Sequence, residues 1–255
     1  MTYFVNQPSI VRQIWGNADT ILFIFAGAAA EFALNKAVDW LYFTGRLPAD
    51  PMGRLFSTVS YARTIVFSEQ AAAERAIDAM ATIHAVVEEK RGRSIPDWAY
   101  RDVLFMLIDY SIRSYEVLER PLSHDEKEEV FHVFYRVGSR MGVQGLPTTF
   151  NDWQIMRQEH LQENTKHSAY TEDLFRQYRR HLGLLRYLML REAQILVVPD
   201  RVRELLSYRP FSLLTPLLTF YRYTRQFRVS GWLKDLILPS AYKSDIKALD
   251  AAPAR

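Results

Sequence analysis

The chain has 255 residues, of which 49% are hydrophobic and 13% aromatic, so it is long enough to bury one sizeable core. It contains no cysteine, which excludes disulfides, iron–sulfur clusters, zinc–thiolate sites and a thiolate ligand to haem. Its net charge of +3 is small for this length and is not typical of a nucleic-acid-binding protein.

The N-terminal region predicts a protein without an export signal or a membrane span. Residues 1–8 lack a basic stretch followed by an apolar run, so we expect no secretory signal and a cytoplasmic location. The most apolar stretch, 21–34, is fourteen residues long and contains Glu31. A membrane-spanning helix needs roughly 20 apolar residues, so this stretch predicts a buried core helix.

A polar cluster that begins at Gly53 is the best indication of chemistry in the sequence. If the segment after Gly53 is helical, Arg54 and Thr58 lie four positions apart and share one face. Residues 48–51, Pro-Ala-Asp-Pro, break the chain before this segment. From the residues alone, Arg54 is an ion-pair or helix-cap residue or a binding group, and Thr58 is a packing residue or a hydrogen-bond donor.

The next predicted helix spans 69–90, with Ser68 as its N-cap. It carries His84 on an otherwise apolar face. Such an imidazole is either a hydrogen-bonded core histidine or a ligand, and haem iron is one partner that suits it. Residues 91–96 end this helix.

Further helices follow at regular intervals. The pattern predicts one helix over 97–118 and another that begins at the capping box of Ser123 and Glu126 and ends near Met141. We expect Thr149 to begin the next helix and Thr171 and Asp200 to cap two more, with Pro210 and Pro216 interrupting the late apolar segment. No strand alternation is sustained over several segments. The fold class is therefore all-α: one helical domain over 1–255, with 240–255 a loosely ordered tail.

Residues 201–234 carry seven basic residues against one acidic residue, with aromatic residues interleaved. This composition is typical of a packed helix pair with a solvated basic edge. It also suits contact with an anionic membrane surface and, in principle, binding of single-stranded nucleic acid. Because the charge is balanced elsewhere, we expect no nucleic-acid partner.

The other histidines and the usual motifs give little support to other enzyme classes. His132 lies among apolar residues and is expected to be a core histidine, whereas His124, His160, His167 and His181 lie in polar segments. No histidine pair with zinc spacing, no glycine-rich nucleotide loop and no serine nucleophile elbow is present.

Several short stretches occur in the order and spacing of one known family. They are Asp50-Pro51-Met52-Gly53-Arg54 with Thr58, Val66-Phe67-Ser68 with Ala71, Ile83-His84-Ala85-Val86-Val87, Ser114-Tyr115-Glu116, Arg120-Pro121-Leu122-Ser123 with Glu126, and Gly145-Leu146-Pro147-Thr148-Thr149-Phe150. Over about 21–239 the chain resembles the family of bacterial latex-clearing rubber oxygenases and fungal mpaB-type oxygenases, an all-helical group that binds haem b.

The resemblance implies a helical bundle that encloses a haem b pocket. It makes His84 the axial ligand of the iron and places Arg54 and Thr58 beside the haem as catalytic and cofactor-binding residues. The implied enzyme is a haem-dependent oxygenase that uses dioxygen and a small, apolar, unsaturated substrate, with cleavage of a carbon–carbon double bond or a related oxidation. The competing hypothesis is a non-catalytic helical protein that docks on a membrane or a partner through 201–234.

The chain departs from the rubber oxygenases at several positions. Their distal lysine would fall at Ser57, and their upstream carboxylate does not transfer, since Glu31 and Asp39 are the nearest candidates and neither has the family's spacing. The sequence Asp102-Val103-Leu104 replaces the frequent Trp-Val-His. These departures argue against polyisoprene as the substrate more than against haem.

Overall fold

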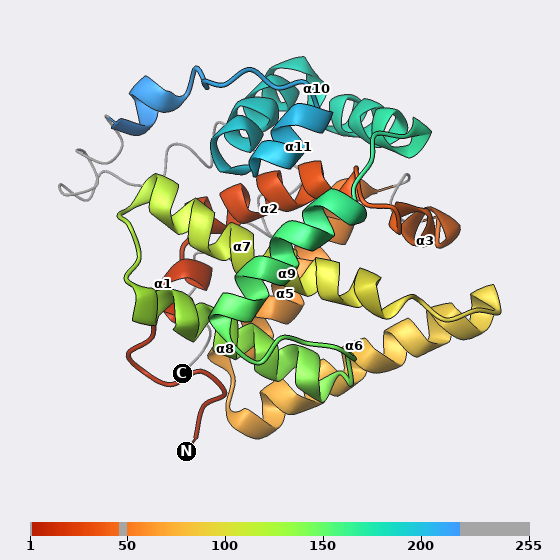
Figure 1. The fold of residues 1–255 in the computed structure, drawn as a ribbon, viewed down its shortest axis with the longest axis vertical. Coiled ribbons are helices and arrows are strands. Elements are labelled where there is room, and N and C mark those ends of the chain that lie inside the picture. Colours follow the sequence, from red (N-terminus) through yellow and green to blue (C-terminus); the bar gives the residue numbers. More distant parts are fainter. Residues whose placement is uncertain (1, 46–49, 220–255) are drawn as a thin grey trace.

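The computed structural model describes residues 2–45 and 50–219, with the side chains at 51, 52 and 54–56 left out of the description. The described helices are α1 (Ile10–Trp15), α2 (Ala18–Phe32), α3 (Val38–Phe43), α5 (Pro51–Phe67), α6 (Gln70–Arg91), α7 (Asp97–Leu118), α8 (His124–Arg140), α9 (Phe150–Glu163), α10 (Ala169–Val197) and α11 (Asp200–Leu205). Over these residues there is no β-strand, only two isolated bridges. The predicted all-α class is confirmed (Figure 1).

The centre of the molecule is the contact between α2 and α7, and its closeness depends on one glycine. A Cβ on Gly27 would lie 2.2 Å from the ring of Tyr110, so only glycine lets the two helices approach this far. The Tyr110 hydroxyl donates to Glu31 one turn further along α2, at 2.8 Å. The predicted core helix over 21–34 is thus confirmed as α2, although Asn17 caps it and starts it earlier, at Ala18.

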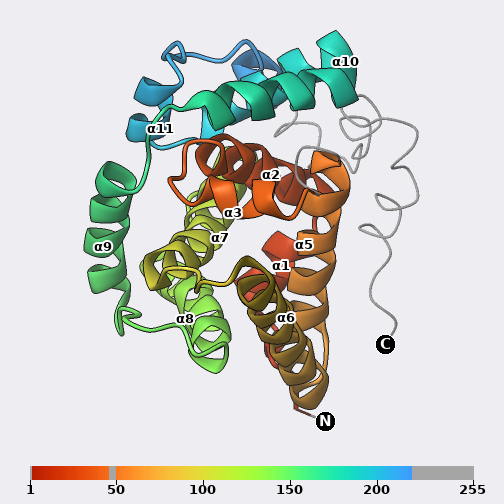
Figure 2. The ribbon, with the colours of Figure 1, turned by 90° about the vertical axis from the view of Figure 1, so that its right-hand side faces the viewer.

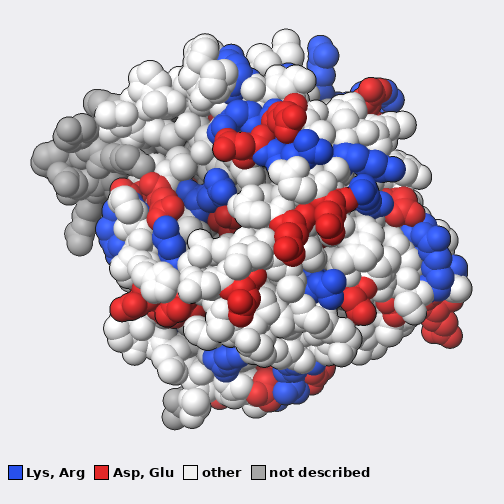
Figure 3. Space-filling model, viewed as in Figure 1, with Lys and Arg blue, Asp and Glu red and all other residues white. Residues whose placement is uncertain are grey.

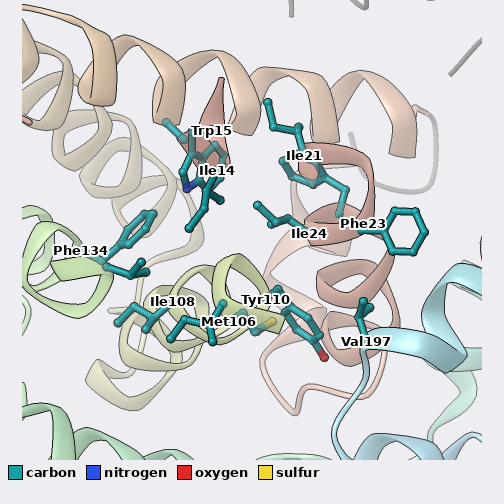
Figure 4. Packing of buried hydrophobic residues seen from close by; sticks show 14 of the residues in the cluster. Ile14, Trp15, Ile21, Phe23, Ile24, Met106, Ile108, Tyr110, Phe134 and Val197 are labelled. Atoms are coloured by element: carbon teal, nitrogen blue, oxygen red, sulfur yellow. The ribbon is translucent and has the colours of Figure 1, made fainter. Parts of the chain in front are cut away.

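One contiguous hydrophobic core surrounds this contact (Figure 4). The fully buried Trp15 of α1 packs against Phe134 of α8, with ring centroids 5.9 Å apart, and its indole N–H donates to Ser111 of α7 at 3.2 Å. Burying this indole without a partner would be costly, so the hydrogen bond fixes where α1 meets α7. None of the helices in the described ranges combines the length and apolar character needed to cross a membrane.

Some predicted boundaries are confirmed and others are shifted. The helix over 97–118 is α7, and the capping box of Ser123 and Glu126 begins α8. Ser68 is not the N-cap of α6; its N–H still donates to Thr64 at the end of α5, and Glu69 takes the N-cap position. That the whole chain forms one domain stays a prediction, because 220–255, including the tail over 240–255, lie outside the described residues.

Two late caps were predicted wrongly by a few residues. Ser168, not Thr171, is the N-cap of α10, and its N–H donates to the Thr171 hydroxyl at 3.0 Å. Thr171 is completely buried and its hydroxyl donates to the carbonyl of Ala33, so tertiary packing determines its role. Pro199, not Asp200, occupies the N-cap of α11. Pro216 lies in the first turn of a helical segment that begins at 215, a position where proline is tolerated.

Candidate functional site

The segment that carries Arg54 is helical as predicted, and a side-chain cap starts it. The Asp50 carboxylate accepts a hydrogen bond from the N–H of Gly53 at 2.8 Å, and proline occupies the first helical position of α5. A Cβ on Gly53 would lie 2.0 Å from the Asp50 carboxylate, so the cap requires glycine there. Arg54 follows in the first turn of α5, but its side chain lies outside the described part of the structure.

Thr58 lies one turn after Arg54 on α5 and is half-buried. Helix α5 contacts α6, the short turn at 68–69 joins them, and the two helices diverge from this turn (Figure 2). The N-terminal segment ties this turn down, since the N–H of Gln70 donates to the carbonyl of Thr2 at 2.9 Å. The structure therefore places the three predicted site residues on two helices that contact each other.

His84 lies in the second half of α6 and is half-buried, with its Nδ1 atom shielded from solvent. Its ring meets Tyr100 of α7 edge to face, with centroids 5.3 Å apart and an interplanar angle of 79°. The Tyr100 hydroxyl donates to Glu88 at 3.2 Å, and Glu88 also accepts from the N–H of Ile95 at 2.7 Å. Burial and the neighbouring Glu88 raise the pKa of Tyr100, so its hydroxyl stays protonated and remains a donor.

The other histidines have different environments, and the prediction for His132 is wrong. His132 is exposed on α8 and is not a core histidine. His160, which the sequence placed in a polar segment, is buried, and its Nδ1 lies 2.5 Å from the Asp102 carboxylate. Asp102 also accepts from the side-chain amides of Asn35 at 2.8 Å and Asn164 at 3.1 Å. This polar cluster joins α7, α9 and the segment after α2.

The upstream carboxylate Glu31 is committed to a buried ion pair. Both of its oxygens accept from Arg157 of α9, at 2.5 and 2.6 Å, and Arg157 also donates to Asp109 of α7 at 3.0 and 3.1 Å. Arg113 donates to the other oxygen of Asp109 at 2.7 Å. We call these four residues, with Tyr110, the ionic cluster.

The pKa values within the ionic cluster follow from its mutual pairing. Burial alone would raise the pKa of Asp109, but the positive charges of Arg157 and Arg113 hold it below its usual value. Burial would lower the pKa of Arg157, and the carboxylates of Glu31 and Asp109 raise it instead. Arg157, Arg113 and Asp109 are therefore charged. Both oxygens of Glu31 accept from Arg157, so neither is left to act as a base.

Asp39, the second candidate for the upstream carboxylate, belongs to the end of α6. It accepts from Arg91 at 2.6 Å, and the Arg91 guanidinium also lies over the ring of Trp40, 4.0 Å from its centroid. Gly92 ends α6 in the left-handed conformation, with φ of 70°. These contacts give Asp39 a structural role in holding α3 against the end of α6.

The donors in the described residues can be compared with what a haem iron requires. Nowhere in 2–45 or 50–219 do three or more His, Asp or Glu side chains gather in a way that could hold a metal ion. A haem iron needs only one protein donor, because the porphyrin supplies four nitrogens. The imidazole of His84, beside the ring of Tyr100, fits that requirement.

Comparison with known families agrees with this geometry. Residues 12–229 match the family described as ER-bound oxygenase mpaB/B′/rubber oxygenase, catalytic domain. The match covers all ten described helices except the first residues of α1, and it makes the protein an oxygenase-type oxidoreductase. The chain belongs to the mpaB and rubber oxygenase family. No curated protein and no solved structure gives a significant match.

The sequence analysis missed Tyr100 and the partners of His160. Tyr100 was not singled out because its approach to His84 depends on how α6 and α7 meet around residues 92–96. For His160 a local signal existed. Phe150, Trp153, Arg157, His160 and Leu161 are all buried and follow one helical stripe. An arginine and a histidine within such a stripe predict buried polar partners.

Proposed function

We propose that this protein is a haem b-dependent oxygenase that acts with dioxygen on a small, apolar, unsaturated molecule. The observation that carries the proposal is that His84 lies on α6, a helix that contacts the helix bearing Arg54 and Thr58, within a chain that matches an oxygenase family over 12–229. When bound, the haem would supply the activation of dioxygen for oxidation of a carbon–carbon double bond.

His84 is assigned to hold the iron through its neutral imidazole. The edge of its ring faces Tyr100, and the Tyr100 hydroxyl is itself fixed by Glu88. Tyr100 therefore restricts the rotation of the His84 ring about its side-chain bonds. A ligand with a fixed ring plane costs less entropy to bind than a freely rotating one.

We assign hydrogen bonding and charge stabilisation in the site to Thr58 and Arg54. The Thr58 hydroxyl can donate to a substrate oxygen or orient a water molecule, and its helical position places it on the same side of α5 as Arg54. The guanidinium of Arg54 carries a permanent positive charge, which suits stabilisation of negative charge that develops on oxygen. Because Ser57 stands where rubber oxygenases have a lysine, we infer a substrate other than polyisoprene.

The visible absorption spectrum tests this proposal. The full chain, purified from haem-replete cells, should show a Soret band equivalent to one haem per chain. His84→Ala should remove or strongly shift this band while the far-ultraviolet circular dichroism stays unchanged. His132→Ala is the matched control, because His132 is exposed on α8 and its loss should leave the spectrum as it is.

Two outcomes would refute parts of the proposal. A colourless wild-type protein that cannot be reconstituted with haemin would remove the haem enzyme altogether. A His84→Ala variant with an unchanged Soret band would keep haem but transfer the ligand role to another residue. A substrate search among unsaturated lipids, terpenoids and polyketides follows only from the expected result.

A further inference from the structure

A group of large apolar side chains is exposed at one end of the molecule. Leu184, Leu185 and Leu188 of α10 and Phe211 and Leu213 of the segment after α11 are each 47–67% exposed. We call these five residues the apolar patch. Monomeric proteins rarely expose several large apolar side chains together, so a contiguous group of this kind marks a binding surface.

The two halves of the apolar patch adjoin each other because Glu192 joins them. On α10, residues 184, 185, 188 and 192 follow one helical stripe, so Glu192 continues the line of leucines. The Glu192 carboxylate accepts from the N–H of Leu213 at 2.7 Å and from the Ser212 hydroxyl at 2.9 Å, and it pairs with Arg209. Leu213 is thereby fixed at the end of the leucine stripe.

The hydrogen bonds around Glu192 favour the charged form of its carboxylate. Burial opposes its ionisation, but the hydrogen bonds from Leu213, Arg209 and Ser212 outweigh burial and hold the pKa of Glu192 below its usual value. The segment over 209–213 is therefore held on α10 at neutral pH, and its two apolar side chains stay outside the core.

A kink in α10 separates the apolar patch from the first half of that helix. Gly183 has φ of 74° and ψ of 169°, a conformation that residues with a Cβ rarely adopt. The leucines begin immediately after it. The kink gives residues 184–197 a direction different from that of the first half of α10 (Figure 1).

The chain on both sides of the kink in α10 is rich in arginine. Between Arg176 and Arg191 the chain has five arginines and no acidic residue, and Arg179 and Arg180 are exposed. Arg176 pairs with Asp173, as Arg201 pairs with Glu204 and Arg203 with Asp200 at the start of 201–234. Figure 3 shows acidic side chains next to basic ones over α11.

We propose that the apolar patch and the arginines of α10 form a docking surface for an anionic lipid membrane. Apolar side chains flanked by arginines are what interfacial binding requires, because the leucines enter the acyl boundary while the arginines meet anionic headgroups. The surface differs from the contact over 201–234 that the sequence suggested, of which 220–234 lie outside the described residues. The proposal does not depend on haem.

Flotation of the full chain with lipid vesicles tests the proposal. The protein should float with vesicles of phosphatidylcholine and phosphatidylserine, bind much less to phosphatidylcholine alone, and dissociate as salt is raised. The double variant Leu185→Ser/Leu213→Ser should bind about tenfold or more weakly, because two apolar side chains no longer leave water. Arg179→Gln/Arg180→Gln should weaken binding to the anionic vesicles about tenfold.

Ile155→Ser is the matched control, because Ile155 is 62% exposed but lies on α9, away from the apolar patch. It should bind vesicles as the wild type does. Equal binding by the double leucine variant would overturn the proposal, and so would equal binding to vesicles without phosphatidylserine. A wild-type dimer in sedimentation velocity that the leucine variant dissociates would overturn it in favour of self-association. All variants should keep the wild-type far-ultraviolet circular dichroism spectrum.

Discussion

The ionic cluster and the α5–α6 pair differ in how deeply their polar residues are buried and in what these residues contact. In the ionic cluster every charge faces an opposite charge: Arg157 is 2% exposed and both Glu31 oxygens accept from it. On α5 and α6 the proposed site residues Thr58 and His84 are only half-buried, and the His84 ring meets the ring of Tyr100 edge to face. A functional imidazole must keep a nitrogen for its ligand, whereas a structural charge must not stay unpaired.

The residues that we expect to determine stability and those that we expect to bind haem therefore lie on different parts of the molecule. The ionic cluster joins α2, α7 and α9, and the cluster of Asp102 and His160 joins α7 and α9 to the segment that follows α2. Both clusters include residues of α7, and α7 contacts α1 and α8. Helix α1 in turn contacts α5, and α8 contacts α6. We therefore expect substitutions in the two clusters to act on the free energy of unfolding and substitutions on α6 to act on haem binding.

The largest expected effect is that of Arg157→Met. This change leaves the carboxylates of Glu31 and Asp109 buried without their counter-ion, which should lower the free energy of unfolding by about 3–5 kcal/mol. Urea denaturation followed by circular dichroism measures the loss. Arg140→Met is the control, since Arg140 forms exposed ion pairs with Asp78 at 2.7 Å and Glu74 at 3.3 Å, and its loss should change stability far less. Equal losses in the two variants would contradict the structural role of the ionic cluster.

The second effect in size is that of Asp102→Asn. The Asp102 carboxylate accepts hydrogen bonds from His160, Asn35 and Asn164. An asparagine here would replace one accepting oxygen with an NH2 group, which would face another hydrogen-bond donor. We expect a loss of about 2–3 kcal/mol in the free energy of unfolding, with the haem spectrum retained. Asp102→Asn would contradict this reading if it removed the Soret band without a change in the urea midpoint, because His160 would then be linked to the haem.

How much the sequence predicted depended on whether the signal was local. The bounds of α7 and the capping box of α8 could be predicted, because residues within a few positions determine them. The partners of Arg157 could not be predicted, since Glu31 lies 126 positions away and no local pattern connects the two. The exposure of His132 was predicted wrongly because its apolar neighbours in sequence face the core while His132 itself lies on the opposite side of α8.

The candidate site shows the same division. Arg54, Thr58 and His84 were identified through a resemblance of short stretches in sequence, and the structure adds that their helices pack together. Tyr100 follows only from three dimensions, because α6 ends at Arg91 and the chain turns before α7 brings the ring to His84. Residues that act directly leave a pattern in a family's motifs, whereas residues that position them depend on packing.

Acid should weaken the ionic cluster in a defined direction. The pKa of Asp109 is lowered in the folded state, so its contribution to stability is fully present above the usual aspartate value and is lost as the pH falls through the folded value. Urea denaturation between about pH 5 and pH 2 should show the wild type losing more stability than Asp109→Asn. A wild-type curve that is parallel to the curve of the variant would contradict the pairing of Asp109 with Arg157 and Arg113.

The smallest effect expected is that of Tyr100→Leu, and it should appear in haem binding rather than in the fold. The edge-to-face contact restricts the His84 ring, and an aromatic pair of this geometry is worth about 0.5–1.5 kcal/mol. Removing it should weaken haem affinity about two- to tenfold and shift the Soret maximum, as measured by titration of the apoprotein with haemin. Tyr100→Phe is the matched control. It removes only the hydroxyl that donates to Glu88 and keeps the ring beside His84, so its affinity should stay closer to that of the wild type. If Tyr100→Phe instead lost as much affinity as Tyr100→Leu, the hydrogen bond to Glu88 and not the ring contact would be what orients His84.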